Sequence, residues 1–213
     1  HRMPTGYSCF AGIEDAPPVA PRQDGPVVFG SFNNLTKLTD PTLRLWARLL
    51  ERVQDSRLLV KAMALSRPGI RRAYERRMAA CGLPMDRVDF AGAEADRSAH
   101  LRQMGRADIA LDPIPFPGGG SSREVLWMGV PVVTLTGATW MSRVGASILG
   151  RVGLDDLVTG TEAAYLDAAA GLAADPDRLT DLRQGLRGRM RAGPLMDCEG
   201  YTRDLERLLI GLS

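Results

Sequence analysis

Histidine and cysteine are scarce in this sequence of 213 residues, which contains two histidines and three cysteines. The cysteines, Cys9, Cys81 and Cys198, lie far apart and show none of the paired spacing that metal sites use. An odd number of scattered cysteines predicts no disulfide framework, so we expect a reducing compartment, the cytoplasm. The composition therefore gives no indication of a resident metal.

Net charge and long apolar runs are lacking as well. Lysine and arginine together number 27, against 25 for aspartate and glutamate, which gives a formal charge of +2. This balance predicts neither a nucleic-acid partner nor a membrane-binding face. No apolar run reaches membrane-spanning length, and the first residues lack the apolar core of a signal peptide. Because His1 and Arg2 precede Met3, we expect a piece excised from a longer protein.

Hydrophobic residues make up 45% of the chain, enough for a packed core, and they fall into short runs separated by helical patterns. Residues 1–26 are rich in proline and glycine and predict an extended arm or linker. Strands are predicted over residues 27–32, 57–62, 88–92, 109–112 and 130–135, with a short one at 156–159. Helices are predicted between them, the first with Asp40 as its N-cap and Pro41 at its first position.

This alternation predicts an α/β fold, a Rossmann-like doubly wound parallel sheet over residues 27–160. Residues 161–213 predict only helices, broken near residues 174–178 and 191–195, and we expect them to pack on this lobe as a C-terminal tail. Ligands of such sheets bind at the carboxyl ends of the strands. The loops that follow the strands are therefore the place to look for a site.

Three of these loops carry polar groups. Asn34 and Lys37 follow the first strand, and Arg97 and His100 follow the third. Each has a plainer alternative: an asparagine-rich turn beside a solvated lysine, and surface residues in the first turn of a helix. Lys61 is unusual at the end of a buried strand and is expected to point towards the same edge.

The loop after the fourth strand reads FPGGGSSRE and contains Gly118, Gly119 and Gly120. A helix is predicted to begin at Ser121 or Ser122, and its first amide protons have no partner inside the helix. Glycines let a ligand approach the backbone closely, so the pattern predicts a phosphate or diphosphate site, the alternative being three turn glycines. No lysine follows the glycines as in phosphate-loop hydrolases, and the loop follows the fourth strand, unlike the dinucleotide motif.

Two further residues belong to this loop and its helix. Asp112 ends the preceding strand and is expected to order the loop rather than to perform chemistry. Glu124 lies one turn inside the helix, where it is placed to accept hydrogen bonds from ribose hydroxyls; the alternative is a solvated helix residue.

Several sequence words, in order, resemble the carboxy-terminal half of the O-linked N-acetylglucosamine transferase or Spindly-like family, glycosyltransferase family 41. They are VVFGSFNNLTKL, RLLVKA, HLRQMGRADIALDPIPFPGGGSS, EVLWMGVPVVTL, SRVGASIL and PLMDCEGYTRDLERL. The resemblance runs from about residue 27 to the end of the chain. It implies the C-terminal lobe of a GT-B fold. It further implies transfer of sugar from a UDP-sugar, UDP-N-acetylglucosamine, to serine or threonine of a protein acceptor.

The resemblance also implies partners and the absence of a cofactor. No metal is required, and the chain would lack the amino-terminal catalytic lobe, whose histidines face the acceptor, and a tetratricopeptide array. Alone it is expected to be inactive. Alternatives are a relative that uses GDP-fucose, a relative that transfers glucose from UDP-glucose to asparagine, and a degenerate module that serves only as an interaction surface.

Site residues carried over by motif contact the nucleotide-sugar. Lys37 matches the diphosphate lysine and is the residue to which we assign catalysis, while Asn34 stands where the family commonly has a glutamine. Arg97 falls beside the uracil, His100 matches a nucleotide-contacting histidine and Glu124 replaces a ribose-binding aspartate. Where animal members read Gly-His-Thr-Thr-Gly, this chain has Gly118, Gly119, Gly120, Ser121 and Ser122. Further departures are Gln103, where animal members have an arginine, and Arg123.

Overall fold

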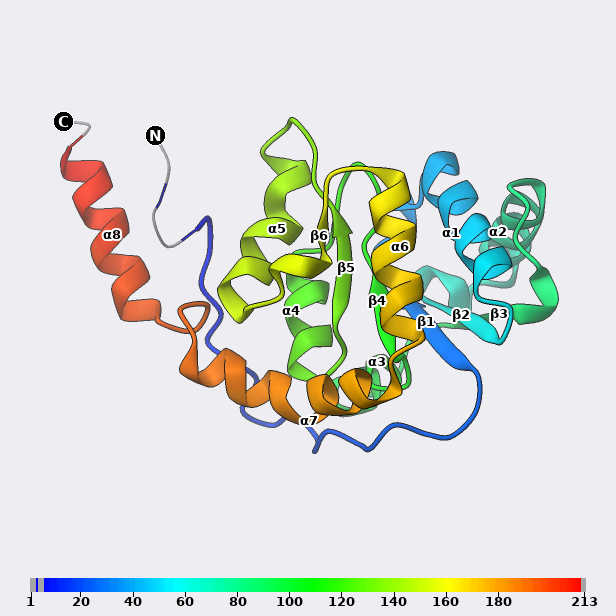
Figure 1. Cartoon of the computed structure of the whole chain (residues 1–213), viewed down its shortest axis with the longest axis horizontal. Coiled ribbons are helices and arrows are strands. Elements are labelled where there is room, and N and C mark those ends of the chain that lie inside the picture. Colours follow the sequence, from blue (N-terminus) through cyan, green and yellow to red (C-terminus); the bar gives the residue numbers. More distant parts are fainter. Residues whose placement is uncertain (1–2, 4–5, 212–213) are drawn as a thin grey trace.

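A six-stranded parallel β-sheet forms the centre of the molecule (Figure 1). The computed structural model describes residue 3 and residues 6–211; the first two residues, which suggested an excised piece, lie outside this part. The strands are β1 (Val27–Ser31), β2 (Ser56–Lys61), β3 (Val88–Ala91), β4 (Ile109–Leu111), β5 (Val132–Leu135) and β6 (Val158–Thr159). Their order across the sheet is β3-β2-β1-β4-β5-β6, and every neighbouring pair is parallel. The predicted doubly wound sheet is confirmed.

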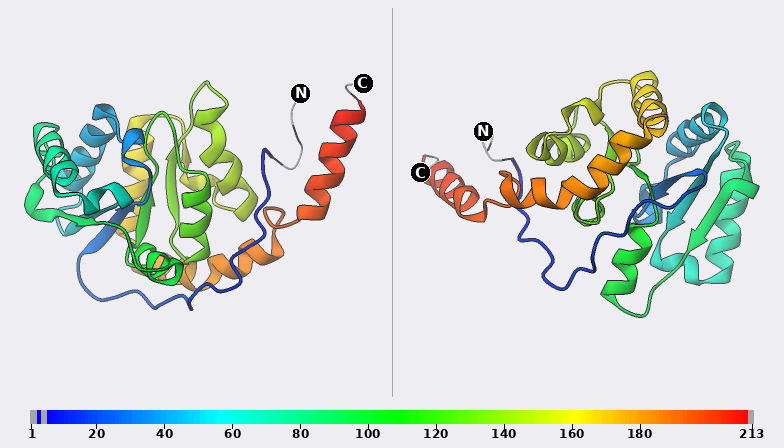
Figure 2. Two further views of the ribbon diagram at one scale, coloured as in Figure 1. Left: turned by 180° about the vertical axis from the view of Figure 1, so that it is seen from behind. Right: turned by 60° about the horizontal axis from the view of Figure 1, so that its bottom comes forward.

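Helices cover both faces of the sheet, which is why its strands are apolar on both sides. The helices are α1 (Asp40–Arg52), α2 (Pro68–Ala80), α3 (Arg97–Met104), α4 (Gly120–Trp127), α5 (Val144–Leu149), α6 (Glu162–Ala173), α7 (Pro176–Ala192) and α8 (Cys198–Ile210). Helices α1 and α6 pack against each other on one face, and α3, α4 and α5 follow one another on the other (Figure 2). Phe29, Leu58 and Val133 in the sheet are fully buried between these layers.

A buried hydrogen-bonded chain ties one face to the carboxyl end of β4. Trp46 of α1 and Tyr165 of α6 are both fully buried, and Trp46 Nε1 donates to the Tyr165 hydroxyl at 3.3 Å. That hydroxyl donates in turn to the carbonyl oxygen of Asp112 at 3.1 Å. Each polar atom of these large side chains thus has a partner, as burial demands.

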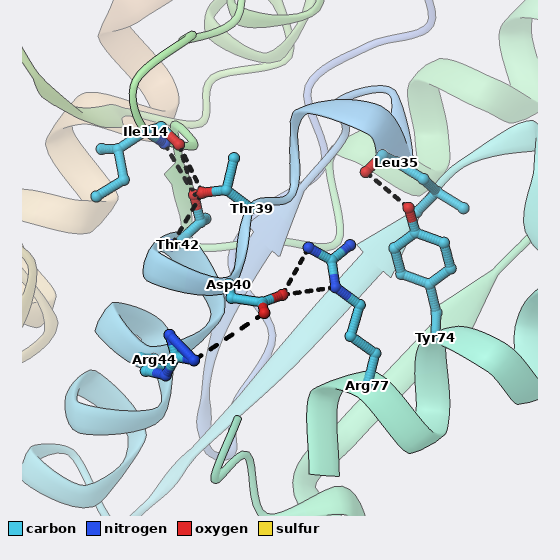
Figure 3. Close-up of polar contacts among 8 residues, drawn as sticks. All are labelled: Leu35, Thr39, Asp40, Thr42, Arg44, Tyr74, Arg77 and Ile114. Carbon is cyan, nitrogen blue, oxygen red and sulfur yellow. Dashed lines mark hydrogen bonds and ion pairs between the residues drawn. The ribbon is translucent and has the colours of Figure 1, made fainter. Parts of the chain in front are cut away.

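The start of α1 differs from the prediction by one residue. Thr39 is the N-cap, and its side chain accepts the backbone N–H of Thr42 at 3.3 Å. Asp40, predicted as the cap, occupies the first turn, and its carboxylate accepts from Arg77 of α2 at 2.7 Å (Figure 3). Threonine and aspartate are both common N-caps; here Thr39 takes this role, and Asp40 pairs with Arg77 instead.

The C-terminal tail is helical, as predicted, and in the N-terminal arm the described residues, 3 and 6–26, form neither helix nor strand. Helix α7 packs on α4 and α6, whereas α8 stands away from the sheet beside the arm (Figures 1 and 2). Several contacts fasten the arm along the lobe, of which three illustrate its course. Arg187 of α7 donates to the carbonyl of Pro17 at 2.9 Å, Arg22 pairs with Asp108 at 3.2 Å, and Phe10 packs edge-on against the Trp127 ring.

Candidate functional site

The order of the sheet reverses between β1 and β4, so the loops after these two strands lie together at the carboxyl ends. In open α/β sheets this reversal forms the crevice in which ligands bind. The loop after β1 passes through the short 3-10 helix η1 (Leu35–Lys37) into α1, and the loop after β4 carries the three glycines into α4. The two sequence words NNLTK and GGGSSRE are therefore neighbours in space.

Hydrogen bonds join these two loops (Figure 3). The Thr42 hydroxyl donates to the carbonyl oxygen of Ile114 at 2.9 Å and accepts the N–H of Ile114 at 3.0 Å. Thr39 Oγ1 donates to the same carbonyl at 2.8 Å. From α2, the Tyr74 hydroxyl donates to the carbonyl of Leu35 at 2.9 Å. These bonds fix η1 relative to the loop that follows β4.

Lys37 ends η1 and reaches the residue that precedes the first glycine. Its Nζ donates to the carbonyl oxygen of Pro117 at 2.8 Å and lies 3.8 Å from the centre of the Phe116 ring, a cation–π arrangement. Partial burial lowers the pKa of Lys37, and the nearby carboxylate of Asp112 acts in the opposite direction. The ammonium group is thus held at the entrance of the glycine loop.

The two asparagines after β1 have different roles. The side-chain oxygen of Asn34 accepts the N–H and the hydroxyl of Thr36 at 3.0 and 3.1 Å, so Asn34 caps η1 while its residue remains exposed. Asn33 is buried, and its Oδ1 accepts the hydroxyl of Ser121 at 3.3 Å. Asn33 therefore connects the first loop directly to the start of α4.

Asp112, directly after β4, is 2% exposed and organises the glycine loop. Its Oδ1 accepts the N–H of Gly118 at 2.9 Å and the hydroxyl of Ser122 at 3.0 Å. Burial raises the pKa of Asp112 to about 6, although the hydrogen bonds to its carboxylate and the charge of Lys37 act in the opposite direction. These contacts agree with the loop-ordering role expected from the sequence.

The three glycines differ in what their surroundings allow. A Cβ at Gly118 would lie 2.0 Å from Ser122 Oγ, so a side chain there would have to displace this hydroxyl from its bond to Asp112. A Cβ at Gly119 would lie 3.2 Å from the Tyr7 hydroxyl, whereas nothing lies within 4 Å of one at Gly120. Gly119 is the N-cap of α4, and no side-chain hydrogen bond caps this helix. The first N–H groups of α4 are thus placed to hold an anion.

A second group of predicted residues meets beside this loop. Glu124 of α4 lies 3.4 Å from the Arg97 guanidinium and 3.8 Å from His100 Nε2, both on α3. The hydrogen bond from His100 is the main cause that lowers the pKa of Glu124. His100 Nδ1 lies 2.8 Å from Nζ of Lys61, which ends β2 and is buried. Because an ammonium only donates, Nδ1 accepts and the ring proton lies on Nε2, towards Glu124.

A cleft of about 680 Å³ opens at the carboxyl ends of β1, β2 and β3. Among the residues that line it are Asn33, Asn34, Lys61, Arg97 and His100. Its volume lies in the range of small-molecule sites. The glycine loop adjoins the cleft through the contact between Ser121 and Asn33 rather than lining it. The predicted residues thus form two adjacent clusters, one around the glycine loop and one in the cleft, joined by α4.

Sequence reasoning missed some residues of this region. Met63 and Arg67, which follow β2, also line the cleft. Tyr7 approaches Gly119 from the N-terminal arm, and no sequence pattern indicated this because it depends on the route of the arm over the lobe. Lys61 did carry a signal, since a lysine that ends a buried strand needs a polar destination.

Two negative findings apply to the part of the chain that the structure describes. There, no group of three or more histidine, cysteine, aspartate or glutamate side chains is arranged to hold a metal ion. Within the same residues, no helix is both long and apolar enough to cross a membrane.

A doubly wound parallel sheet with a polar crevice at its switch point and a helical tail defines a Rossmann-like lobe of the kind found in GT-B glycosyltransferases. The model of one family, Glycosyl transferase family 41, matches residues 21–205. The chain belongs to this family.

Relatives agree with this assignment. The chain is 39% identical over 208 residues to the "Probable UDP-N-acetylglucosamine--peptide N-acetylglucosaminyltransferase SPINDLY" of Oryza sativa subsp. japonica, covering 96% of this chain and 22% of that protein. It is 32% identical over 187 residues to the UDP-N-acetylglucosamine--peptide N-acetylglucosaminyltransferase of Caenorhabditis elegans, covering 87% of this chain and 16% of that protein. The chain thus spans about a fifth of the length of these relatives.

Solved structures give the same picture. A mutant of the Thermobaculum terrenum O-GlcNAc transferase superposes with a TM-score of 0.83 at 35% identity, over 92% of this chain and 38% of that one. The sucrose-phosphate synthase of Thermosynechococcus elongatus superposes with a TM-score of 0.60 at 20% identity, over 100% of this chain and 52% of that one. The second likeness supports the fold alone.

Proposed function

We propose that this chain is the UDP-sugar-binding lobe of a protein O-glycosyltransferase that moves N-acetylglucosamine from UDP-N-acetylglucosamine to serine or threonine. The observation that carries the proposal is the contact of Lys37 with the carbonyl of Pro117, which brings a cation to the start of a glycine loop and an uncapped helix. The names of the two relatives, which specify UDP-N-acetylglucosamine and a peptide, supply the donor and the acceptor class.

The diphosphate is assigned to the glycine loop. The N–H groups at the start of α4 and the positive end of its dipole favour an anion, and the hydroxyls of Ser121 and Ser122 are close by. Lys37 would exchange its bond to the Pro117 carbonyl for a bond to a phosphate oxygen. Nothing lies within 4 Å of a Cβ on Gly120, so the backbone is bare there, and Asn34 lines the neighbouring cleft.

The nucleoside is assigned to the cleft. His100 and Arg97 line it, and Glu124 lies against both, so the carboxylate is held where ribose hydroxyls can donate to it. Lys61 donates a hydrogen bond to Nδ1 of His100, which leaves the ring proton on Nε2. Glu124 reaches the ribose from the same helix whose first turn would hold the diphosphate.

In the transfer itself, the bond between the anomeric carbon and the diphosphate breaks and negative charge builds up on the leaving UDP. Lys37 and the amide groups of α4 are placed to stabilise this charge, which is a large term when the donors are already oriented. In this proposal Lys37 and the start of α4 stabilise the charge on the leaving UDP, a role that a metal ion fills in some transferases. Alignment of the acceptor hydroxyl falls to an amino-terminal lobe, and recognition of the protein acceptor to a tetratricopeptide array. We place the protein in the cytoplasm, a choice supported by its three free cysteines.

Calorimetric titration of the chain with UDP and GDP tests the proposal. We expect UDP to bind, and Lys37→Ala to weaken UDP binding by about 1–3 kcal/mol, roughly 5- to 150-fold, the range for losing a charge-assisted hydrogen bond. Arg189→Ala, on the exposed surface of α7, is the matched control and should leave the affinity unchanged.

Other outcomes select the alternatives. Preference for GDP would favour a fucosyl donor, and tighter binding of UDP-glucose than of UDP-N-acetylglucosamine would favour a glucosyl transferase. Absence of nucleotide binding would leave a module that acts only as an interaction surface. A Lys37→Ala variant with the affinity of the unmodified chain would refute the placement of the diphosphate.

A further inference from the structure

The N-terminal arm reaches the glycine loop. In Figures 1 and 2 the arm passes between α8 and the side of the lobe formed by α4 and α5. Tyr7 belongs to the arm, and its hydroxyl is 3.2 Å from the position of a Cβ on Gly119, the N-cap of α4. Among the described residues, none makes a hydrogen bond with this hydroxyl, and Tyr7 is 38% exposed. A free phenolic donor therefore stands beside the uncapped start of the helix.

Several contacts hold Tyr7 in this position. Its carbonyl oxygen accepts the hydroxyl of Tyr201 of α8 at 3.1 Å, and its ring lies 6.4 Å from the ring of Trp140, measured between centroids. The next residue, Ser8, accepts a hydrogen bond from Arg123 at 2.8 Å. Arg123 belongs to α4 itself, so the arm is tied to the helix whose first turn Tyr7 faces. This contact also explains the arginine that departs from the family pattern.

We propose that Tyr7 helps to bind the nucleotide-sugar: its hydroxyl donates a hydrogen bond to a diphosphate oxygen held at the start of α4. This inference rests on the proposed function. A phenol O–H can donate a hydrogen bond, and a diphosphate is rich in acceptors. Lys37 approaches the loop at Pro117 and Tyr7 approaches it at Gly119, so the two donors meet the anion at different points of the loop.

The inference also gives a reason for glycine at position 119. At 3.2 Å from a Cβ, the Tyr7 hydroxyl would be closer than ordinary van der Waals contact allows, so a side chain there would push the phenol away. The bare backbone at Gly119 and the phenol from the arm therefore depend on each other. Gly118, in contrast, is required by Ser122 and needs no ligand to explain it.

The test compares Tyr7→Phe with the unmodified full chain in calorimetric titrations with UDP and with uridine. Phenylalanine keeps the ring against Trp140 and removes only the donor. We expect the dissociation constant of UDP to rise about tenfold, the lower end for a hydrogen bond to a charged group because the phenol stays partly exposed. Uridine, which has no phosphate, should bind both proteins equally.

Tyr201→Phe is the control for the arm. It removes the bond to the Tyr7 carbonyl and leaves the Tyr7 hydroxyl in place, so UDP affinity should change by less than about twofold, as for a minor loss of support. Equal UDP affinity of Tyr7→Phe and the unmodified chain, with Lys37→Ala still weakened, would overturn the inference and leave the proposed function standing. An equal loss for UDP and uridine would also overturn it, since the effect would then be structural. A chain that binds no UDP would refute both.

Discussion

Replacing Asp112 with asparagine should remove a pH-dependent loss of stability that the buried carboxyl group imposes. Its pKa is about 6 in the folded chain, against an ordinary value of 3.8. The folded state therefore holds this proton more tightly than the unfolded state does. The stabilisation that comes from this proton is fully present below about pH 4 and is lost as the pH rises through about 6. A shift of about two pKa units corresponds to about 3 kcal/mol at pH 7 and above.

Asparagine at position 112 should preserve the hydrogen bonds that the carboxylate accepts. Its side-chain oxygen accepts the N–H of Gly118 and the hydroxyl of Ser122 as the aspartate does, but it carries no charge. Asp112→Asn and the unmodified chain should thus have similar free energies of unfolding near pH 4. Above pH 7 the variant should be more stable by up to about 3 kcal/mol.

Urea unfolding curves at pH 4.5, 6.0 and 7.5, followed by tryptophan fluorescence, measure this difference. Asp24→Asn, at an exposed position of the arm, is the control and should show no pH-dependent difference. A difference in unfolding free energy between Asp112→Asn and the unmodified chain that is the same at all three pH values would refute this prediction. A variant that becomes relatively less stable as the pH rises would also refute it.

Two further predictions concern the loops of the site. Gly118→Ala should lower the free energy of unfolding by about 1–3 kcal/mol, because its Cβ would overlap a serine hydroxyl 2.0 Å away. Gly120→Ala, with nothing within 4 Å of its Cβ, should leave the free energy of unfolding unchanged. Equal effects of the two substitutions would contradict this prediction. Thr42→Val should cost about 0.5–1.5 kcal/mol, the net contribution of one hydrogen bond, by leaving the part-buried N–H of Ile114 without its partner. Thr180→Val, exposed on α7, is the comparison, and urea unfolding measures all four variants.

Most of the sheet was predictable because parallel strands buried on both faces leave a strong mark in the sequence. The first strand was predicted over residues 27–32 and spans Val27–Ser31, and the short strand predicted at 156–159 spans Val158–Thr159. Helix boundaries were less certain where several residues suit a cap, as with Thr39 and Asp40. Asp40 was predicted as the cap, but Thr39 takes this role and Asp40 bonds to Arg77, which is remote in the chain.

The site was predictable to the extent that strand order brings loops together. A doubly wound sheet places the loop with Lys37 beside the glycine loop, and the structure has them in contact. The hydrogen-bond and ion-pair partners of individual side chains could not be predicted from strand order. Asn34 caps η1, and Glu124 is already engaged by Arg97 and His100, because these contacts depend on how loops and helices settle in three dimensions.

The reason for each glycine was also hidden from the sequence. Gly118 is dictated by packing against Ser122, a plain structural cause, while the space at Gly119 is set by a residue of the arm. A run of three identical residues thus combines three different local environments. Only the distances from each backbone position to its neighbours separate them.

The position of β1 beside β4 has a consequence for how this chain is made. The N–H of Val28 bonds to Asp108, 80 positions later, so one edge of β1 stays without a partner while the intervening chain emerges from the ribosome. Strands β1 to β3 can pair in that interval, and their exposed edge is a point at which nascent chains can stick to one another. The crevice between the two halves exists only after they join. A molecule that binds there would therefore select chains in which β4 has already paired with β1.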